Sequence, residues 1–258
     1  MEEHRIATVS GFISLIETIK RQEEDAGNKA DFIYRGQQEN WELEPKLARK
    51  VPPGKRANTE QIIFDEFKRT SLAYTRLRPE TDWELLAIAQ HYGLPTRLLD
   101  WTYSALAGLW FAIGKGPSFK NGVPKDGVVW LLKTRRQDFL DPETPGTPFA
   151  PTRTVIYRPN AITERIMAQR GIFTVHRMMP DDERFILFEK NTKYRDRLVK
   201  FYIEPGEFVP MRKHLDGCGV NEVTLFPDLA GLSADLAWRY TNHFVMPVKR
   251  IKSSRRKK

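Results

Sequence analysis

Apolar residues recur at helical spacing in the first third of the chain. Segment 10–24 carries them three and four residues apart, and Ser10 stands where an N-cap is expected. The same spacing recurs at 59–77 and again at 81–92, where the segment ends in glycine and proline. The pattern therefore predicts three N-terminal helices.

The pattern changes after Gly127. Residues 128–132 form a short apolar run bounded by glycine and by charged residues, as expected of a buried strand. We predict further strands at 32–34, 98–99, 154–157, 172–176, 184–188, 198–203 and 222–226, and helices at 105–113, 161–169 and 229–240. The expected fold class is α+β, with the N-terminal helices packed on a mostly antiparallel sheet.

Length and composition favour one domain. A chain of 258 residues with 40% hydrophobic content buries a substantial core. We assign residues 1–245 to a single domain and 246–258 to a basic, disordered tail. No run approaches the roughly 20 apolar residues that span a bilayer, and the N-terminus lacks the layout of a secretory signal. A cytoplasmic protein is expected, and the single cysteine, Cys218, fits a reducing compartment.

The net charge of +9 is concentrated in this tail. Residues Lys249 to Lys258 hold seven basic groups and no acid, so the remainder of the chain carries +2. A tail of this kind can add affinity for phosphates, and nucleic acid is one partner to consider. The simpler interpretation is a solvated terminus.

Two short segments concentrate polar chemistry. In the first, Arg35 follows a predicted strand and precedes Gly36, where the missing Cβ allows the backbone to approach a ligand. A guanidinium at this place can bind a phosphate with two hydrogen bonds. The second segment, 90–102, gathers polar residues around one turn. An internal pair of Arg97 with Asp100 remains an alternative to a functional role.

Both segments resemble the FRG domain. The similarity is carried by residues 32–37 with Trp41 and Pro45, by residues 89–102, and by Phe111-Ala112. It continues through Arg165, Gln169 and residues 171–174, and then through 221–232, so it extends over about residues 10–240. Tyr34 stands where the family name places phenylalanine. The family name implies little chemistry, which has to come from the residues.

A shorter similarity relates the chain to ADP-ribosyltransferases. It consists of an aromatic-Arg-Gly sequence on an early strand, a polar strand-to-helix junction, and Asn221-Glu222 at the start of a late strand. It implies a split sheet, NAD as the substrate, and transfer of ADP-ribose to a protein or nucleic-acid acceptor. From the biology of small accessory domains, a toxin or a phage-defence effector is the expected context.

This second similarity also implies roles for individual residues. Glu222 would hydrogen-bond a ribose hydroxyl and stabilise the positive charge that develops when the nicotinamide bond breaks. Arg35 would bind the diphosphate or the adjoining ribose, and Thr102 would hold Glu222. The Gly36 backbone would bind the nicotinamide amide, and an aromatic ring would stack on the ligand. The implied NAD-binding residues are Tyr34, Gly36, Gln37, Gln90, His91, Tyr92, Thr96, Arg97, Asp100, Trp101 and Asn221.

A binding module without catalysis is the alternative. Arg35, Arg97 and Trp101, together with the basic tail, would then contact the phosphates and bases of a nucleic acid or a nucleotide. Glu222 discriminates between the two hypotheses, because a carboxylate repels phosphate but is required for transfer. No metal is expected, since the five histidines are scattered without paired ligand spacing.

Overall fold

The computed structural model describes residues 1–74, 77–141, 146–160 and 163–243, with no side-chain description for 242–243. The predicted tail at 246–258 lies outside the described residues, as do the first two residues of the predicted helix 161–169. Among the described residues, no helix combines the length and the apolar character that crossing a membrane requires.

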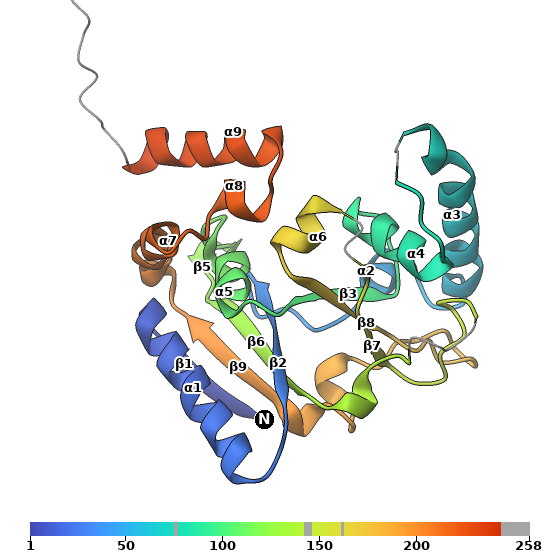
Figure 1. Ribbon diagram of the computed structural model, residues 1–258, viewed down its shortest axis with the longest axis horizontal. Coiled ribbons are helices and arrows are strands. Elements are labelled where there is room, and N and C mark those ends of the chain that lie inside the picture. Colours follow the sequence, from blue (N-terminus) through green and yellow to red (C-terminus); the bar gives the residue numbers. More distant parts are fainter. Residues whose placement is uncertain (75–76, 142–145, 161–162, 244–258) are drawn as a thin grey trace, which may run out of the picture.

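A seven-stranded sheet with the order β1-β9-β6-β2-β3-β8-β7 forms the centre of the fold (Figure 1). Adjacent strands run antiparallel, except for the parallel pair of β1 with β9. The α+β class with a mostly antiparallel sheet is therefore confirmed. The strands are β1 (Glu2–Ile6), β2 (Asp31–Gln37), β3 (Leu98–Thr102), β6 (Gly127–Thr134), β7 (Val155–Tyr157), β8 (Gly171–Val175) and β9 (Leu198–Ile203).

The sheet opens between its two central strands. Strand β2 pairs with β6 along its whole length, from Asp31 to Gln37. In the described chain, however, β2 pairs with β3 at a single position, Tyr34 opposite Thr102. The sheet therefore consists of two halves that meet at this position and diverge beyond it.

Helices cover one face of the first half. The side chains of α1 (Val9–Asp25), α5 (Ala105–Ile113) and α7 (Phe208–Gly217) share one apolar cluster with β2, β6 and β9. Helix α5 lies directly on β2, because Gly36 and Gly108 face each other without side chains. A Cβ on Gly36 would come within 2.0 Å of the Gly108 carbonyl oxygen.

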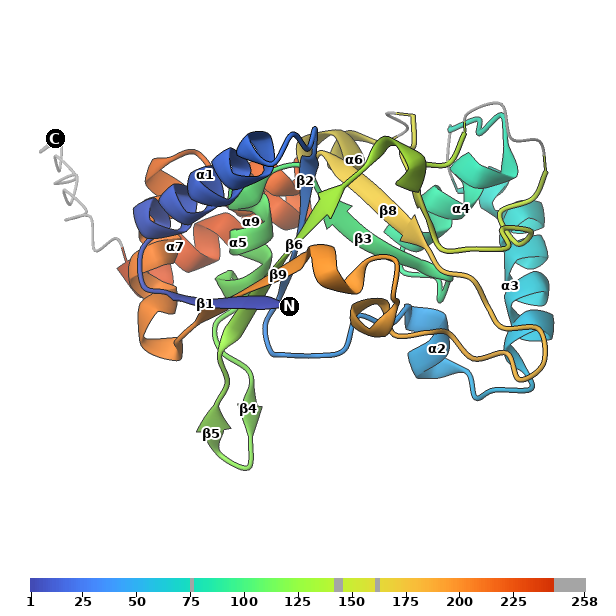
Figure 2. The same ribbon diagram turned by 90° about the horizontal axis from the view of Figure 1, so that it is seen from below.

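A second group of helices packs against the other half of the sheet, on the right of Figure 1. Helices α3 (Arg56–Thr70) and α4 (Asp82–His91) share an apolar cluster with β3, β7, β8 and α6 (Glu164–Ala168). The opposite face of the sheet is covered by the cluster around Trp130, Phe188 and Tyr194. Figure 2 shows the short hairpin of β4 (Phe119–Lys120) and β5 (Val123–Pro124) projecting from the body.

The remaining elements are short or terminal. Helices α8 (Glu222–Leu225) and α9 (Leu229–Trp238) follow α7, and α2 (Lys46–Lys50) precedes α3. The other helical turns are η1 (Ser71–Ala73), η2 (Arg136–Asp138), η3 (Phe188–Lys190), η4 (Arg195–Arg197), η5 (Pro205–Glu207) and η6 (Arg239–His243).

Three local predictions are wrong. Helix α1 begins one residue earlier than Ser10, and the Thr8 hydroxyl caps it by accepting from the Gly11 N–H. Segment 184–188 forms no strand beyond one isolated bridge between Met178 and Phe185, and η3 already begins at Phe188. Residues 222–225 of the predicted strand 222–226 form the helix α8. The Asn221 side chain caps α8 by accepting from the Thr224 N–H, and this cap overrides the β-propensity of the segment.

Candidate functional site: the cleft between β2 and β3

A cleft of about 350 Å³ lies at the junction of the two half-sheets. We call it the β2–β3 cleft. Its floor comes from β2 and β3, and its walls from α4, α5, α6 and the chain after α8. The lining residues are Tyr34, Arg35, Gly36, Gln90, His91, Asp100, Trp101, Thr102, Phe111, Arg165, Gln169 and Phe226.

Arg35 lies at the point where the strands separate. It directly follows Tyr34, the one residue of β2 that pairs with β3. Its Nη1 donates to the carbonyl oxygen of Asp100 at 2.8 Å, so the guanidinium takes the place of a ladder hydrogen bond. The same Nη1 lies 3.7 Å from the Asp100 carboxylate. Burial lowers the pKa of Arg35, and the charge of Asp100 opposes this shift.

The guanidinium of Arg35 retains unused hydrogen-bonding capacity. Its Nε is buried and has no hydrogen-bond partner among the described residues. The side chain is nevertheless 16% exposed, so part of it faces the cleft. A buried donor without a partner carries a free-energy cost of about 1–3 kcal/mol, which a bound acceptor or a water molecule would relieve.

Asp100 is held in place from α4. The amide Nε2 of Gln90 donates to both carboxylate oxygens of Asp100, at 3.1 and 3.0 Å. The Gln90 Oε1 in turn accepts from the Thr96 hydroxyl at 2.7 Å, which fixes the orientation of the amide. The Asp100 side chain is 56% exposed. The cleft therefore presents one accessible, oriented carboxylate.

The opposite wall combines a cation with aromatic rings. Arg165 forms an ion pair with Asp228, and its guanidinium carbon lies 5.4 Å from the centre of the Phe226 ring. Phe111 packs edge to face against Phe226. Burial and the nearby charge of Arg165 lower the pKa of His91, so this ring is neutral at pH 7 and can donate and accept hydrogen bonds.

A second concavity of about 350 Å³ adjoins the cleft. His91 and Arg165 line both spaces, and Tyr92, Glu164 and Asp228 line the second. The two spaces together can take a ligand with two parts, or a ligand together with a reaction partner. Among the described residues, no group of three or more His, Cys, Asp or Glu side chains is placed to hold a metal ion.

Residues 30–121 match the model of the FRG domain. The chain contains an FRG domain. The match includes β2, β3, α4 and α5, which supply the floor and two walls of the cleft. The similarity that we describe at 165–174 and 221–232 lies outside the matched residues. No curated protein and no solved structure matches the chain.

The FRG domain and the segments after it bring most of the predicted site residues together. Eight of them line the cleft: Tyr34, Arg35, Gly36, Gln90, His91, Asp100, Trp101 and Thr102. Tyr92 lines the adjoining concavity and is exposed. Two residues of this group have structural explanations as well. Gly36 is required for contact with α5, and the Trp101 indole is buried and donates to the Thr174 hydroxyl at 3.1 Å.

Three predicted ligand-binding residues serve the interior of the fold instead. Arg97 is buried and forms a bidentate ion pair with Glu60 of α3. The distance between Arg97 Nη2 and Glu60 Oε2 is 2.6 Å. Its partner is therefore Glu60 and not Asp100. Gln37 accepts a hydrogen bond from the Trp130 indole at 2.9 Å. Thr96 is buried behind Gln90.

The predicted triad of Arg35, Thr102 and Glu222 is not assembled. Glu222 begins the helix α8, and its carboxylate pairs with Arg212 of α7 at 2.8 Å, outside the lining of the cleft. Thr102 donates to the carbonyl oxygen of Gln169 at 2.6 Å, not to Glu222. Asn221 caps α8 and donates to Asp216. The prediction of Glu222 on a strand facing Arg35 was wrong.

Four residues of the cleft were not predicted as site residues, namely Phe111, Arg165, Gln169 and Phe226. All four fall in the segments that carry the resemblance to the FRG domain, and this was the available signal. Their spacing along the chain carries no recognisable motif. The Gln169 amide donates to the Leu225 carbonyl at 3.0 Å, which attaches the chain after α8 to the wall of the cleft.

Proposed function

We propose that the β2–β3 cleft of the FRG domain binds a nucleotide. The observation that carries this proposal is the guanidinium of Arg35, which is held at the base of the cleft with an Nε that has no hydrogen-bond partner among the described residues. Arginine binds phosphate well because its planar guanidinium can donate hydrogen bonds to two phosphate oxygens at once. The volume of about 350 Å³ falls within the range of roughly 300–1,000 Å³ that is typical of ligand pockets.

The remaining lining residues fit the other parts of a nucleotide. Phe111 and Phe226 offer apolar ring surfaces for a base. The Asp100 carboxylate can accept from both hydroxyls of a ribose, and His91 and Gln169 can supply further hydrogen bonds. The adjoining concavity behind His91 and Arg165 gives a dinucleotide such as NAD a place for its second half.

The test is direct binding measured by calorimetry, with NAD, ADP-ribose, AMP and inorganic phosphate as probes. We expect Arg35→Lys to weaken nucleotide binding by about 10-fold or more, because a hydrogen bond to a charged group is worth about 1.5–3 kcal/mol. Arg21→Lys is the matched control, since Arg21 is exposed on α1 and is not among the residues that line the cleft. Equal affinity of wild type and Arg35→Lys for every probe would refute the proposal.

A transfer reaction on NAD is the second candidate, and it depends on nucleotide binding in the cleft. Asp100 supports it, because its exposed carboxylate lies 3.7 Å from Arg35, whereas Glu222 lies outside the lining. The nicotinamide–ribose bond would break with nicotinamide leaving as a neutral molecule. The acceptor would bond to the same ribose carbon and release its proton to Asp100 or to water. Asp100 would stabilise the positive charge on the ribose.

NAD consumption separates the two functions. For the transferase, we expect Asp100→Asn to abolish the release of nicotinamide and Glu222→Gln to retain it. Binding without turnover, across protein and nucleic-acid acceptors, would leave the FRG domain as a nucleotide-binding module. A fall in cellular NAD on expression of the chain, absent with Asp100→Asn, would in addition support a role as a toxin or a phage-defence effector.

The nucleic-acid module with Arg35, Arg97 and Trp101 has less support at this site. Arg97 is bound to Glu60 and the Trp101 indole is buried, so two of its three proposed contacts are occupied. The basic tail at Lys249 to Lys258 lies outside the described residues.

A further inference from the structure

A larger concavity of about 920 Å³ lies apart from the cleft and shares none of its lining residues. It is formed by the end of α1 and the following turn, the end of β6, the η2 segment and η4. Six cationic side chains line it: Lys29, Lys133, Arg135, Arg136, Arg153 and Arg197. The lining contains two carboxylates, Glu23 and Asp141. We call this concavity the basic basin.

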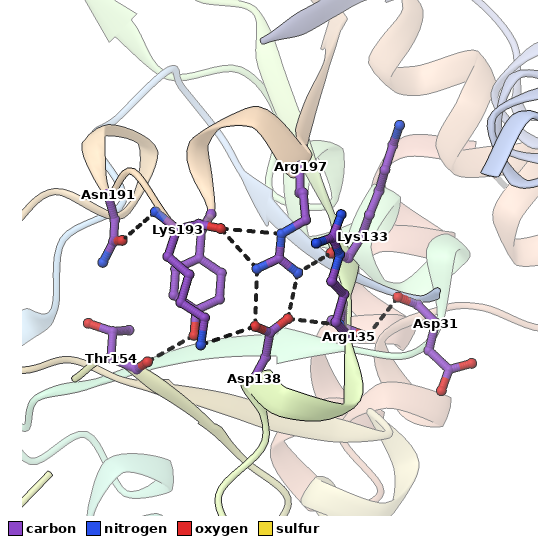
Figure 3. Close-up of polar contacts among 10 residues, drawn as sticks. Asp31, Lys133, Arg135, Asp138, Thr154, Asn191, Lys193 and Arg197 are labelled. Atoms are coloured by element: carbon purple, nitrogen blue, oxygen red, sulfur yellow. Dashed lines mark hydrogen bonds and ion pairs between the residues drawn. The ribbon is translucent and has the colours of Figure 1, made fainter. Parts of the chain in front are cut away.

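The floor of the basin is held rigidly by one buried carboxylate (Figure 3). The Asp138 side chain is 0% exposed and accepts from Arg197 Nη1 at 2.5 Å and Nη2 at 3.1 Å. It also accepts from the backbone N–H of Arg135 at 2.8 Å, and Lys193 lies 3.4 Å away. One negative charge therefore serves two cations, and the network fixes η2, which carries Arg136.

The charges in this network also shift the pKa values of its members. Burial alone would raise the pKa of Asp138, but the hydrogen bonds from Arg197 and Arg135 outweigh burial and lower it. Burial and the neighbouring charge of Arg153 lower the pKa of Lys193. Asp138 is thus charged at pH 7, yet its charge does not compensate the cations around it.

Four cations remain available at the rim. Lys29, Arg135, Arg136 and Arg153 are exposed, and none forms an ion pair with another described residue. Lys133, by contrast, is paired with Glu23 at 2.9 Å. Like charges gathered on a concave wall focus a positive potential, which attracts an extended anion.

An aromatic ring lies beside these cations. Phe139 lines the basin and the neighbouring concavity that contains Arg158. The guanidinium carbon of Arg158 lies 5.3 Å from the centre of the Phe139 ring and 5.4 Å from that of Tyr103. Proteins bind single-stranded nucleic acids through such surfaces. The guanidinium groups of arginine contact the phosphates, and the aromatic rings stack on the bases.

From this arrangement we propose that the basic basin binds the phosphate backbone of single-stranded nucleic acid. The contact is independent of base sequence, with Arg135, Arg136 and Arg153 on phosphates and Phe139 beside a base. It does not depend on nucleotide binding in the β2–β3 cleft. A polynucleotide bound in the basin would thus be held on the same molecule as the β2–β3 cleft.

The test uses the full chain and a fluorescein-labelled oligouridine of about a dozen nucleotides, with binding followed by anisotropy. We expect the Arg135→Glu/Arg136→Glu double variant to bind at least about 10-fold more weakly than wild type. The salt slope of its affinity should fall by roughly 1.4, at about 0.7 for each lost phosphate contact on a single strand. The control is Lys55→Glu/Lys213→Glu, which makes the same change in net charge at exposed sites outside the basin.

Three outcomes would overturn the proposal. The first is equal loss of affinity in the basin variant and in the control, since net charge alone would then explain binding. The second is retention of wild-type affinity by the basin variant together with its loss on removal of residues 249–258, which would assign binding to the tail. The third is absence of binding to oligouridine by a wild-type chain that binds polyglutamate. Thermal unfolding of each variant checks that the fold is retained.

Discussion

The guanidinium of Arg35 donates to the carbonyl oxygen of Asp100 across the opening between the two half-sheets, at 2.8 Å. Strands β2 and β3 diverge next to this contact, and the side chain supplies the hydrogen bond that the ladder no longer provides. An arginine in this position both closes the sheet and presents a cation to the cleft. The sheet and the proposed nucleotide site therefore depend on the same residue.

Arg35→Ala tests the structural part of this role. The substitution leaves the Asp100 carbonyl without its donor and opens a void, so we expect the free energy of unfolding to fall by about 1–3 kcal/mol. Arg35→Lys should cost less, because the charge and much of the side chain remain. Urea denaturation measures both variants. Equal stability of Arg35→Ala and wild type would show that the contact with Asp100 does not hold the strands.

Gly36→Ala tests the packing of α5 on β2. A Cβ at this position would lie 2.0 Å from the Gly108 carbonyl oxygen and 2.5 Å from the Ala112 nitrogen, both backbone atoms. Since the backbone of α5 has to move, we expect a loss of about 3 kcal/mol or more. Gly217→Ala is the control, because no atom lies within 4 Å of its added Cβ and alanine favours the helix. A fully stable Gly36→Ala would contradict the observed packing.

The Arg97–Glu60 pair should be sensitive to removal of one partner. The two side chains are 4% and 2% exposed, so Glu60→Gln leaves a buried guanidinium uncompensated. We expect a loss of about 3–5 kcal/mol in the free energy of unfolding. Glu66→Gln breaks the exposed pair with Arg69 in the same helix and should cost less than about 1 kcal/mol. Similar losses in both variants would mean that burial does not set the energy of the Arg97 pair.

His176 predicts loss of stability in acid. Burial, with the charges of Arg35 and Arg97, lowers the pKa of His176 to about 3, whereas a histidine in the unfolded chain titrates near 6.5. Between these values the unfolded chain binds a proton that the folded chain does not. The free energy of unfolding should therefore decrease as the pH is lowered, by about 2 kcal/mol from pH 7 to pH 5.

His176→Gln removes this titration while retaining a side-chain partner for Thr174, which lies 3.0 Å from the ring nitrogen Nε2. We expect a flatter dependence of stability on pH in this variant, measured by urea denaturation in the same buffers. A variant curve that runs parallel to the wild-type curve would assign the acid sensitivity to other groups.

Local pattern predicted the elements where neighbouring residues decide the structure. Helix α5 begins after Ser104, whose hydroxyl accepts from the Ala107 N–H, and it covers the predicted residues 105–113. Strand β9 likewise matches the predicted segment 198–203. The strand prediction for segment 222–226 failed because its apolar and β-branched residues favour a strand, while the cap at Asn221 selects a helix. The sequence did contain a local signal for the helix, an asparagine three residues before a threonine. In the prediction, the β-propensity of the segment was given more weight than this signal.

The candidate site could be predicted only as far as its residues lie together in the chain. Gln90 and Asp100 are close in sequence, and both were expected in the site that they now line. Glu60 and Arg97 are 37 residues apart, and no pattern in either segment identifies them as partners. The basin was even less predictable from the sequence, because Lys29, Arg136 and Arg153 come from separate segments of unremarkable composition.

The sequence by itself determined the class of fold, most of its elements and the two polar segments at 34–37 and 90–102, because helical periodicity, caps and glycines act over a few residues. Only the tertiary structure decided which charges meet. It directed Arg97 to Glu60 in the interior and Glu222 to Arg212 outside the cleft, and it left Arg35 with Asp100 where the sheet opens. The reason is physical. A buried charge is stable only beside a partner, and partners are set by how distant elements dock.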